Sequence, residues 1–97
     1  MKVAVTFYAY LREITGKKEK FVIDIGERAT IAELLEELCS ESKVRIALLD
    51  ENLQLKSEIT ILKNGREIKF LDGPDTVLVP GDEISVFPMV AGGNQTV

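Results

Sequence analysis

The chain has 97 residues, enough for one domain with a modest core, and its 45% apolar and 29% charged residues are typical of a globular protein. Acidic and basic residues are interspersed to a net charge of −4, so there is no basic stripe for nucleic acid. There is also no apolar run of the roughly 20 residues that a membrane span needs. With no histidine and one cysteine, a structural zinc site and an internal disulfide are excluded.

The N-terminal part is predicted to contain two strands with a short helix between them. Apolar residues alternate over residues 2–8 and again over residues 20–25, which is typical of half-buried strands. Residues 10–15 have helical character, and Gly16 is a suitable residue to follow the end of a helix. The connection is short, so we expect the two strands to pair in an antiparallel manner.

The clearest predicted element is a helix that begins after Thr30. Thr30 and Glu33 have the spacing of a capping box. Large aliphatic residues then form one helical stripe: Ile31, Leu34, Leu35 and Leu38. Each such side chain contributes about 1.5–3 kcal/mol when it is buried, so the stripe should hold the helix on the sheet. We interpret Cys39 as a half-buried apolar residue, because it has neither a histidine partner nor a helix N-terminus to activate it.

The C-terminal half is predicted to contain a second helix over residues 43–49 and several strands. Asn64-Gly65 is the strongest hairpin signal in the chain. The predicted strands cover residues 58–63, 66–68, 76–79 as a candidate edge piece, and 83–87. Strands in hairpins around one long amphipathic helix indicate an α+β domain with that helix on one sheet face. The first and last strands are the most apolar, so we expect them at the centre of the sheet.

Two adjacent glycines, Gly92 and Gly93, lie near the C-terminus. Because glycine has no Cβ, such a segment can enter a channel that is too narrow for any side chain. Taken alone, the pair fits equally a terminal segment without a role, since termini are commonly loose.

Four segments resemble the sulfur-carrier branch of the ubiquitin-like proteins, which includes the small subunit of molybdopterin synthase and archaeal small ubiquitin-like modifiers. These segments are Tyr8-Ala9-Tyr10-Leu11-Arg12-Glu13, Ile59-Thr60-Ile61-Leu62-Lys63-Asn64-Gly65, Gly81-Asp82-Glu83-Ile84, and Phe87-Pro88-Met89-Val90-Ala91-Gly92-Gly93. The resemblance implies a ubiquitin-like β-grasp fold, with a mixed four- to five-stranded sheet and one main helix packed on one face. It also implies a domain over residues 1–88 and a flexible tail over residues 89–97.

The resemblance further implies that the protein is a carrier rather than an enzyme, with no catalytic residues, no metal and no permanently bound cofactor. An E1-like adenylating enzyme would use ATP to activate the carboxylate of Gly93, and sulfur would then replace AMP. The resulting thiocarboxylate would serve the large subunit of molybdopterin synthase in making molybdopterin or tungstopterin. We expect the free protein to be monomeric, and the N-terminal residues lack the layout of a signal peptide, so we expect it in the cytoplasm.

Two other functions remain open at this point. The protein could be a modifier joined through Gly93 to lysines of target proteins, or an interaction module whose tail is never activated. The thiamine-pathway carriers are a weaker match, because they tend to lack an insertion like residues 43–56. The modifier and the carrier use the same end chemistry, so the sequence does not separate them.

Two departures from the family pattern concern the C-terminal segment. Met89 stands where this branch often has a second proline, from which we expect little effect. Residues 94–97 follow the diglycine, so Gly93 has no free carboxylate in the sequence as given. These residues are either a precursor extension removed by a protease, or foreign residues at the gene end, or the mark of a member that has given up the carrier role.

A docking face is predicted from strand parity. On the first and last strands the outward residues are Ala4, Thr6, Tyr8, Ser85 and Phe87. Parity on the third strand is ambiguous, and the resemblance leads us to place Ile61 outward. Tyr8, Ile61 and Phe87 would then form an apolar patch beside the tail, with Met89 and Val90 as further docking residues. The alternative is that the chain itself covers Phe87.

Overall fold

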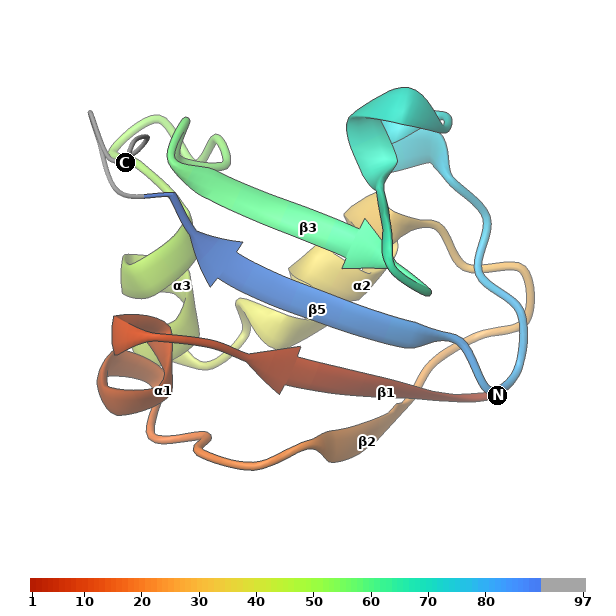
Figure 1. The fold of residues 1–97 in the computed structure, drawn as a ribbon, viewed down its shortest axis with the longest axis horizontal. Coiled ribbons are helices and arrows are strands. Elements are labelled where there is room, and N and C mark those ends of the chain that lie inside the picture. Colours follow the sequence, from red (N-terminus) through yellow and green to blue (C-terminus); the bar gives the residue numbers. More distant parts are fainter. Residues whose placement is uncertain (90–97) are drawn as a thin grey trace.

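Five strands and three α-helices form two layers, shown in Figure 1 as a computed structural model that describes residues 1–89. The strands are β1 (Lys2–Phe7), β2 (Phe21–Asp24), β3 (Ile59–Lys63), β4 (Arg66–Glu67) and β5 (Glu83–Pro88). The helices are α1 (Tyr10–Thr15), α2 (Ile31–Leu38) and α3 (Ser42–Leu48), with two short 3₁₀ helices, η1 (Ile68–Phe70) and η2 (Gly73–Asp75). No helix in the part of the chain described here is long and apolar enough to cross a membrane.

The strands form one mixed sheet in the order β2-β1-β5-β3-β4. β1 and β5 are parallel, and the pairs β1–β2, β3–β5 and β3–β4 are antiparallel. The predictions of a mixed sheet with the first and last strands at its centre are therefore confirmed. β5 has a strand on each side, so the strand that leads to the C-terminal segment is held along both edges.

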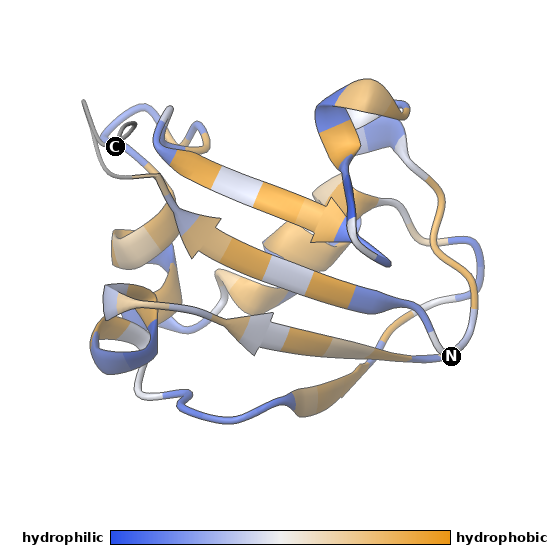
Figure 2. Ribbon diagram, in the orientation of Figure 1, coloured by the Kyte–Doolittle hydropathy of each residue, from blue (hydrophilic) through white to orange (hydrophobic). Residues whose placement is uncertain are grey.

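The hydrophobic core lies between the sheet and the helices. Hydropathy alternates along β1 and much of β5 (Figure 2), and the buried apolar residues of both strands point toward the helices. From the strands, the buried core residues are Val3, Val5, Phe7, Ile59, Ile61, Ile84 and Val86. From the helices, they are Leu11, Ile31, Leu34, Leu38, Val44, Ala47 and Leu48. The opposite face of the sheet is not covered by these helices (Figure 1).

The predicted capping box begins α2. The hydroxyl of Thr30 accepts a hydrogen bond from the Glu33 N–H at 3.2 Å, and the Glu33 carboxylate accepts one from the Thr30 N–H at 2.8 Å. Both bonds satisfy N–H groups that the first turn of a helix leaves without partners. Ile31, Leu34 and Leu38 are buried as predicted, whereas Leu35 is half-buried at the side of the helix.

The Asn64-Gly65 turn is fixed to the start of β5 by a side-chain network. Both residues have positive φ, 51° and 85°, as a type I′ hairpin turn requires. The Asn64 side chain donates to the Asp82 carboxylate at 2.9 Å and accepts from the Glu83 N–H at 2.9 Å. The buried Asp82 carboxylate also accepts from the Val79 N–H at 2.8 Å. The turn therefore fixes the register of β3 against β5 as well as that of the hairpin.

Three local predictions differ from the structure. Residues 76–79 do not form a strand of the sheet; Thr76 and Leu78 pair with the segment before α2, and Val77 forms a single bridge with Thr30. The return strand ends at Glu67, because the chain turns into η1 at Ile68. The loop after Phe70 contains the short helix η2. In the last two cases a short 3₁₀ helix replaces the expected strand residue or loop.

Ala9 lies in a strained turn between β1 and α1. Its φ of 54° and ψ of −140° are those of the second residue of a type II′ turn, and the Leu11 N–H closes the turn on the Tyr8 carbonyl at 3.1 Å. Glycine is the residue this position favours, because a Cβ costs about 1–2 kcal/mol at positive φ.

We therefore expect Ala9→Gly to raise the free energy of unfolding by about 0.5–1 kcal/mol, after the extra entropy of glycine in the unfolded chain is subtracted. Urea unfolding measures it. Ala4→Gly in the regular strand β1 is the matched control and should lower stability by about 0.5–1 kcal/mol. A loss of stability in both variants would contradict the strain assigned to Ala9.

Candidate functional site

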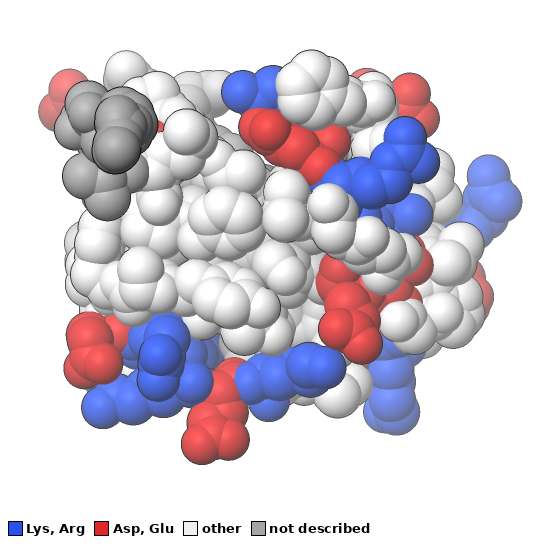
Figure 3. All heavy atoms as spheres, in the orientation of Figure 1, with Lys and Arg blue, Asp and Glu red and all other residues white. Residues whose placement is uncertain are grey.

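The sheet face opposite the helices, called the open face below, carries alternate residues of the three central strands. Residues that pair across strands lie on the same side of a sheet, so the register identifies its members. They are Ala4, Thr6 and Tyr8 at β1 and just beyond it, Ser85 and Phe87 on β5, and Thr60 and Leu62 on β3. Figure 3 shows that the middle of this face is uncharged, while lysine, arginine, aspartate and glutamate side chains lie toward its borders.

Tyr8 and Phe87 form an aromatic pair on the open face. Their ring centroids are 5.8 Å apart with an interplanar angle of 89°, the edge-to-face geometry that aromatic pairs favour. Tyr8 is 43% exposed and Phe87 is half-buried, so Phe87 is partly covered by its own chain but still reaches the surface. The predicted outward orientation of both residues agrees with the structure, and their role in docking stays a prediction.

Ile61 does not belong to this face, and the prediction that it points outward is wrong. Ile61 pairs with Val86, which in turn pairs with Phe7. Val86 and Phe7 point into the core, so Ile61 does too, and it is only 2% exposed. The resemblance does not determine which residues of β3 point outward, because that depends on the pairing register between β3 and β5.

Thr60 and Leu62 occupy the open-face positions that had been assigned to Ile61. Thr60 pairs with Phe87, and Leu62 pairs with Ser85. A signal for this was present in the sequence, because threonine is the single polar residue in the run Ile-Thr-Ile-Leu and suits the core least, although Thr60 itself is only 9% exposed. Leu62 on the same side obscured that signal.

The open face continues toward the C-terminal segment at Met89, whereas Pro88 is buried on the core side of the sheet. Pro88 ends β5 opposite Ile59, and the Met89 N–H still donates to the Glu58 carbonyl at 2.6 Å. The Met89 side chain is 59% exposed. Val90, Gly92 and Gly93 lie outside the described residues, as do residues 94–97, so the predictions about them are untested by the structure.

Other reactive groups do not assemble into a catalytic site within residues 1–89. Cys39 is buried, and this burial raises the pKa of its thiol, although Arg45 acts weakly in the other direction. A protonated, buried thiol is a poor nucleophile. The Met1 ammonium and Lys2 hydrogen-bond to Asp24 and hold the pKa of that carboxyl below its usual range. In the same residues, no group of three histidine, cysteine or acidic side chains is placed to hold a metal ion.

Comparison with known proteins places these features in a family. The model of the ThiS family matches residues 5–93, which include nearly all of the described domain and end at the second glycine. The chain belongs to the ThiS family. Members of this ubiquitin-like group are small carriers and modifiers that generally have no catalytic role of their own.

Three similar proteins support the assignment. Small archaeal modifier protein 3 of Haloferax volcanii is 39% identical over 93 residues, which cover 96% of this chain and 100% of that protein. The crystal structure of SAMP1 from Haloferax volcanii has a TM-score of 0.81 at 22% identity, covering 96% of this chain and 100% of that one. A Pyrococcus furiosus protein provisionally named molybdopterin converting factor, subunit 1, has a TM-score of 0.72 at 27% identity over 93% of this chain and 99% of that one.

These likenesses identify the architecture as the ubiquitin-like β-grasp fold. The fold predicted from the resemblance is therefore confirmed, with five strands in the sheet and α2 packed on one face. The likeness to the SAMP1 structure covers 96% of this chain, so the sheet that carries the open face belongs to a fold that the two proteins share.

Proposed function

We propose that this protein is a sulfur carrier whose Gly93 carboxylate is adenylated and then converted to a thiocarboxylate for molybdopterin or tungstopterin synthesis. The observation that carries the proposal is that the family match ends at Gly93, directly after the central strand β5 and its short extension. The likeness to the Pyrococcus furiosus protein supports the choice of pathway.

The proposed chemistry takes place on partners of the carrier. A carboxylate oxygen of Gly93 would attack the α-phosphate of ATP in an E1-like enzyme, and pyrophosphate would leave. A sulfur nucleophile would then displace AMP from the adenylate. The large subunit of molybdopterin synthase would consume the thiocarboxylate sulfur. In this proposal the carrier itself contributes position and shape.

The geometry suits such a carrier because β5 is held by strands on both sides. A rigid attachment reduces the ordering cost when the segment after β5 enters a partner. The open face lies beside that attachment and offers the exposed Tyr8 and Met89 and the half-buried Phe87 as an apolar docking area. Aromatic residues of this kind commonly dominate interface energies.

The direct experiment is intact-mass measurement after incubation with an E1-like enzyme, ATP and a sulfur donor. A chain ending at Gly93 should gain the 16 Da, in round numbers, that separate a thiocarboxylate from a carboxylate. The full 97-residue chain should stay unchanged unless a protease first removes Asn94–Val97. Failure of the chain that ends at Gly93 to gain mass would reject the carrier function.

A second candidate function is protein modification through an isopeptide bond from Gly93. The likeness to small archaeal modifier protein 3 favours this candidate. Lysine-linked conjugates in cells that express the chain ending at Gly93 would support it. Binding of the thiocarboxylated chain to the large synthase subunit, without conjugates, would support the sulfur carrier.

Phe87→Ala is expected to weaken binding to the activating enzyme or the synthase subunit by about 1–3 kcal/mol, as loss of an aromatic contact residue does. Because Phe87 is only half-buried, the domain should stay folded. Calorimetric titration and a melting curve measure the two effects. Phe70→Ala removes the same side chain from η1, where it is 77% exposed, and should leave binding unchanged. Equal binding by both variants would remove Phe87 from the docking face.

A further inference from the structure

The outer edge of β2 borders the helix side of the sheet and offers a second surface for a partner. Among residues 1–89, β2 is one of the two end strands of the sheet and pairs with β1 alone. The Ile25 N–H donates to the Met1 carbonyl at 2.9 Å. Ile25 and every second residue before it therefore direct their N–H and C=O groups toward β1. The N–H and C=O groups of Val22 and Asp24 therefore point away from β1. Such an edge is a template for another strand.

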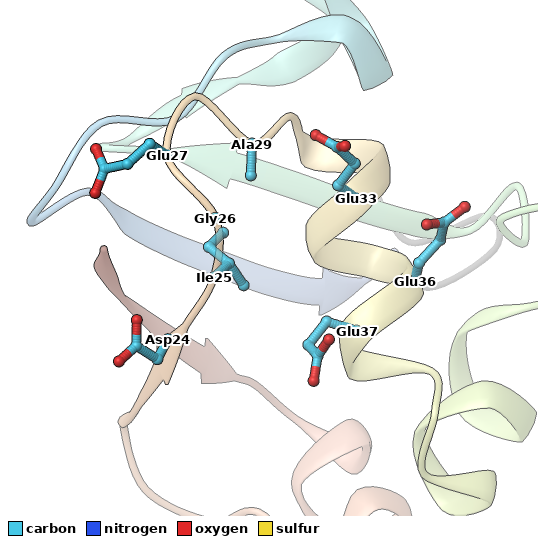
Figure 4. A pocket seen from close by; sticks show the side chains of 8 residues that line it. All are labelled: Asp24, Ile25, Gly26, Glu27, Ala29, Glu33, Glu36 and Glu37. Carbon is cyan, nitrogen blue, oxygen red and sulfur yellow. The ribbon is translucent and has the colours of Figure 1, made fainter.

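Beside this edge is a groove of about 530 Å³ between the end of β2 and helix α2. Figure 4 shows Glu33, Glu36 and Glu37 on α2, opposite the segment that carries Asp24, Ile25 and Glu27. Ile25 and Ala29 also line the groove and give it an apolar part. Ile25 packs against the core and Ala29 is buried, so this part lies at the base. An open strand edge thus adjoins a groove that is apolar at the base and acidic at the rim.

The carboxylates of the groove differ in how far they are already neutralised. The Met1 ammonium lies 3.3 Å from Asp24 and 3.5 Å from Glu27, and Glu33 is engaged in the capping box. Glu36 and Glu37 take part in none of the ion pairs between described residues. The negative charge available to a partner is therefore concentrated on α2.

We propose that this groove binds an extended peptide segment of a partner protein that carries arginine or lysine. The segment adds to the outer edge of β2 as a further strand through the N–H and C=O groups of Val22 and Asp24. Because side chains alternate along a strand, every second one points toward α2. A basic side chain at that position lays its aliphatic stem on Ile25 and brings its cation to Glu36 and Glu37.

Charge selects this occupant over a second copy of the chain. The protein has a net charge of −4, so two acidic grooves would repel each other. The proposal is independent of the Gly93 chemistry, because the groove and the open face lie on opposite sides of the sheet. A partner bound at β2 leaves Tyr8 and Phe87 accessible.

The test uses the full chain labelled with ¹⁵N and an acetylated, amidated hexapeptide that alternates valine with arginine. At low salt, we expect amide shift changes at residues 22–27 and 33–37, and slower hydrogen exchange at the amides of Val22 and Asp24. The double variant Glu36→Lys/Glu37→Lys should bind the peptide at least tenfold more weakly. Glu19→Lys/Glu51→Lys makes the same charge change at exposed positions elsewhere and should bind within about twofold of the original chain.

Two further arms test strand addition itself. Val22→Pro removes an N–H that β1 does not use, so the fold should persist while peptide binding is lost. If this variant fails to fold, a peptide with methylated backbone nitrogens tests the same contact and should not bind. Equal weakening by both charge variants would overturn the proposal, since general attraction would then explain binding. Shift changes confined to the open face, a dimer formed without peptide, or a response to calcium chloride but not to peptide would overturn it too.

Discussion

Replacing Ile61 with alanine should lower the free energy of unfolding by about 2–4 kcal/mol, one of the largest single-residue effects in the domain. The side chain is 2% exposed and lies against the central strand through its pair, Val86. Loss of this much stability should lower the melting temperature by roughly 4–8 °C for each kcal/mol in a domain of this size. Urea unfolding would measure the loss of free energy, with the same dependence on urea concentration for the variant and the original chain.

The upper end of the usual range for such truncations is not expected. Ile61 borders a cavity of about 170 Å³, which is also lined by Leu55, Ile59 and Ile68. This space also borders the exposed Lys69 and Pro74, so part of the volume left by truncation adjoins solvent rather than a closed core.

Leu62→Ala is the matched control, since Leu62 is the next residue and points to the open face. It is half-buried and should cost less than about 1.5 kcal/mol. Partner binding also distinguishes Ile61 from Leu62. Truncation at Ile61 should leave the affinity of the folded protein for its partners unchanged. If Ile61→Ala were as stable as the original chain and bound its partners poorly, the inward placement of Ile61 would be wrong.

Gly93→Ala, in a chain that ends at residue 93, should slow thiocarboxylate formation by about 5- to 150-fold. The α-carbon beside the reacting carboxyl carbon would carry a methyl group, inside a passage that the proposed function requires to be narrow. Overpacking by one methyl group costs about 1–3 kcal/mol, and each 1.36 kcal/mol in the barrier slows a step tenfold. Intact mass over time after addition of enzyme, ATP and sulfur donor gives the rates.

Stability provides the internal check for this variant. We expect the free energy of unfolding to change by less than about 0.5 kcal/mol, as for other substitutions outside a core. Gly26→Ala is a matched glycine control, because Gly26 has no positive φ and an added Cβ would meet no atom within 4 Å. It should react at the original rate. A Gly93→Ala chain that is thiocarboxylated normally would remove the steric argument from the proposed function.

Most of the fold could be predicted from local patterns. The capping box at Thr30, the aliphatic stripe of α2 and the Asn64-Gly65 turn each involve residues close in sequence. Their physical causes are therefore visible in a short window. The strong apolar alternation of β1 and β5 likewise indicated their central places in the sheet.

The docking face was predicted only in part, because it depends on pairing between distant strands. Tyr8 and Phe87 were placed by clear alternation, whereas the run from Ile59 to Leu62 contains apolar residues in both phases. Only the register against β5, fixed by the Asn64–Asp82 contact, decides which phase faces the core. The groove beside β2 could not be predicted either, since it joins a strand edge to a helix surface that pattern analysis treats separately.

The middle position of β5 has a consequence for the order of events during synthesis. β1 and β3 are not neighbours, and β5 is the last of the strands to leave the ribosome. Until it inserts, the two halves of the sheet have no common strand and Tyr8 has no Phe87 to pack against. An activating enzyme that recognises this surface would therefore not bind unfinished or truncated chains. The domain would have to fold before its terminus could be used.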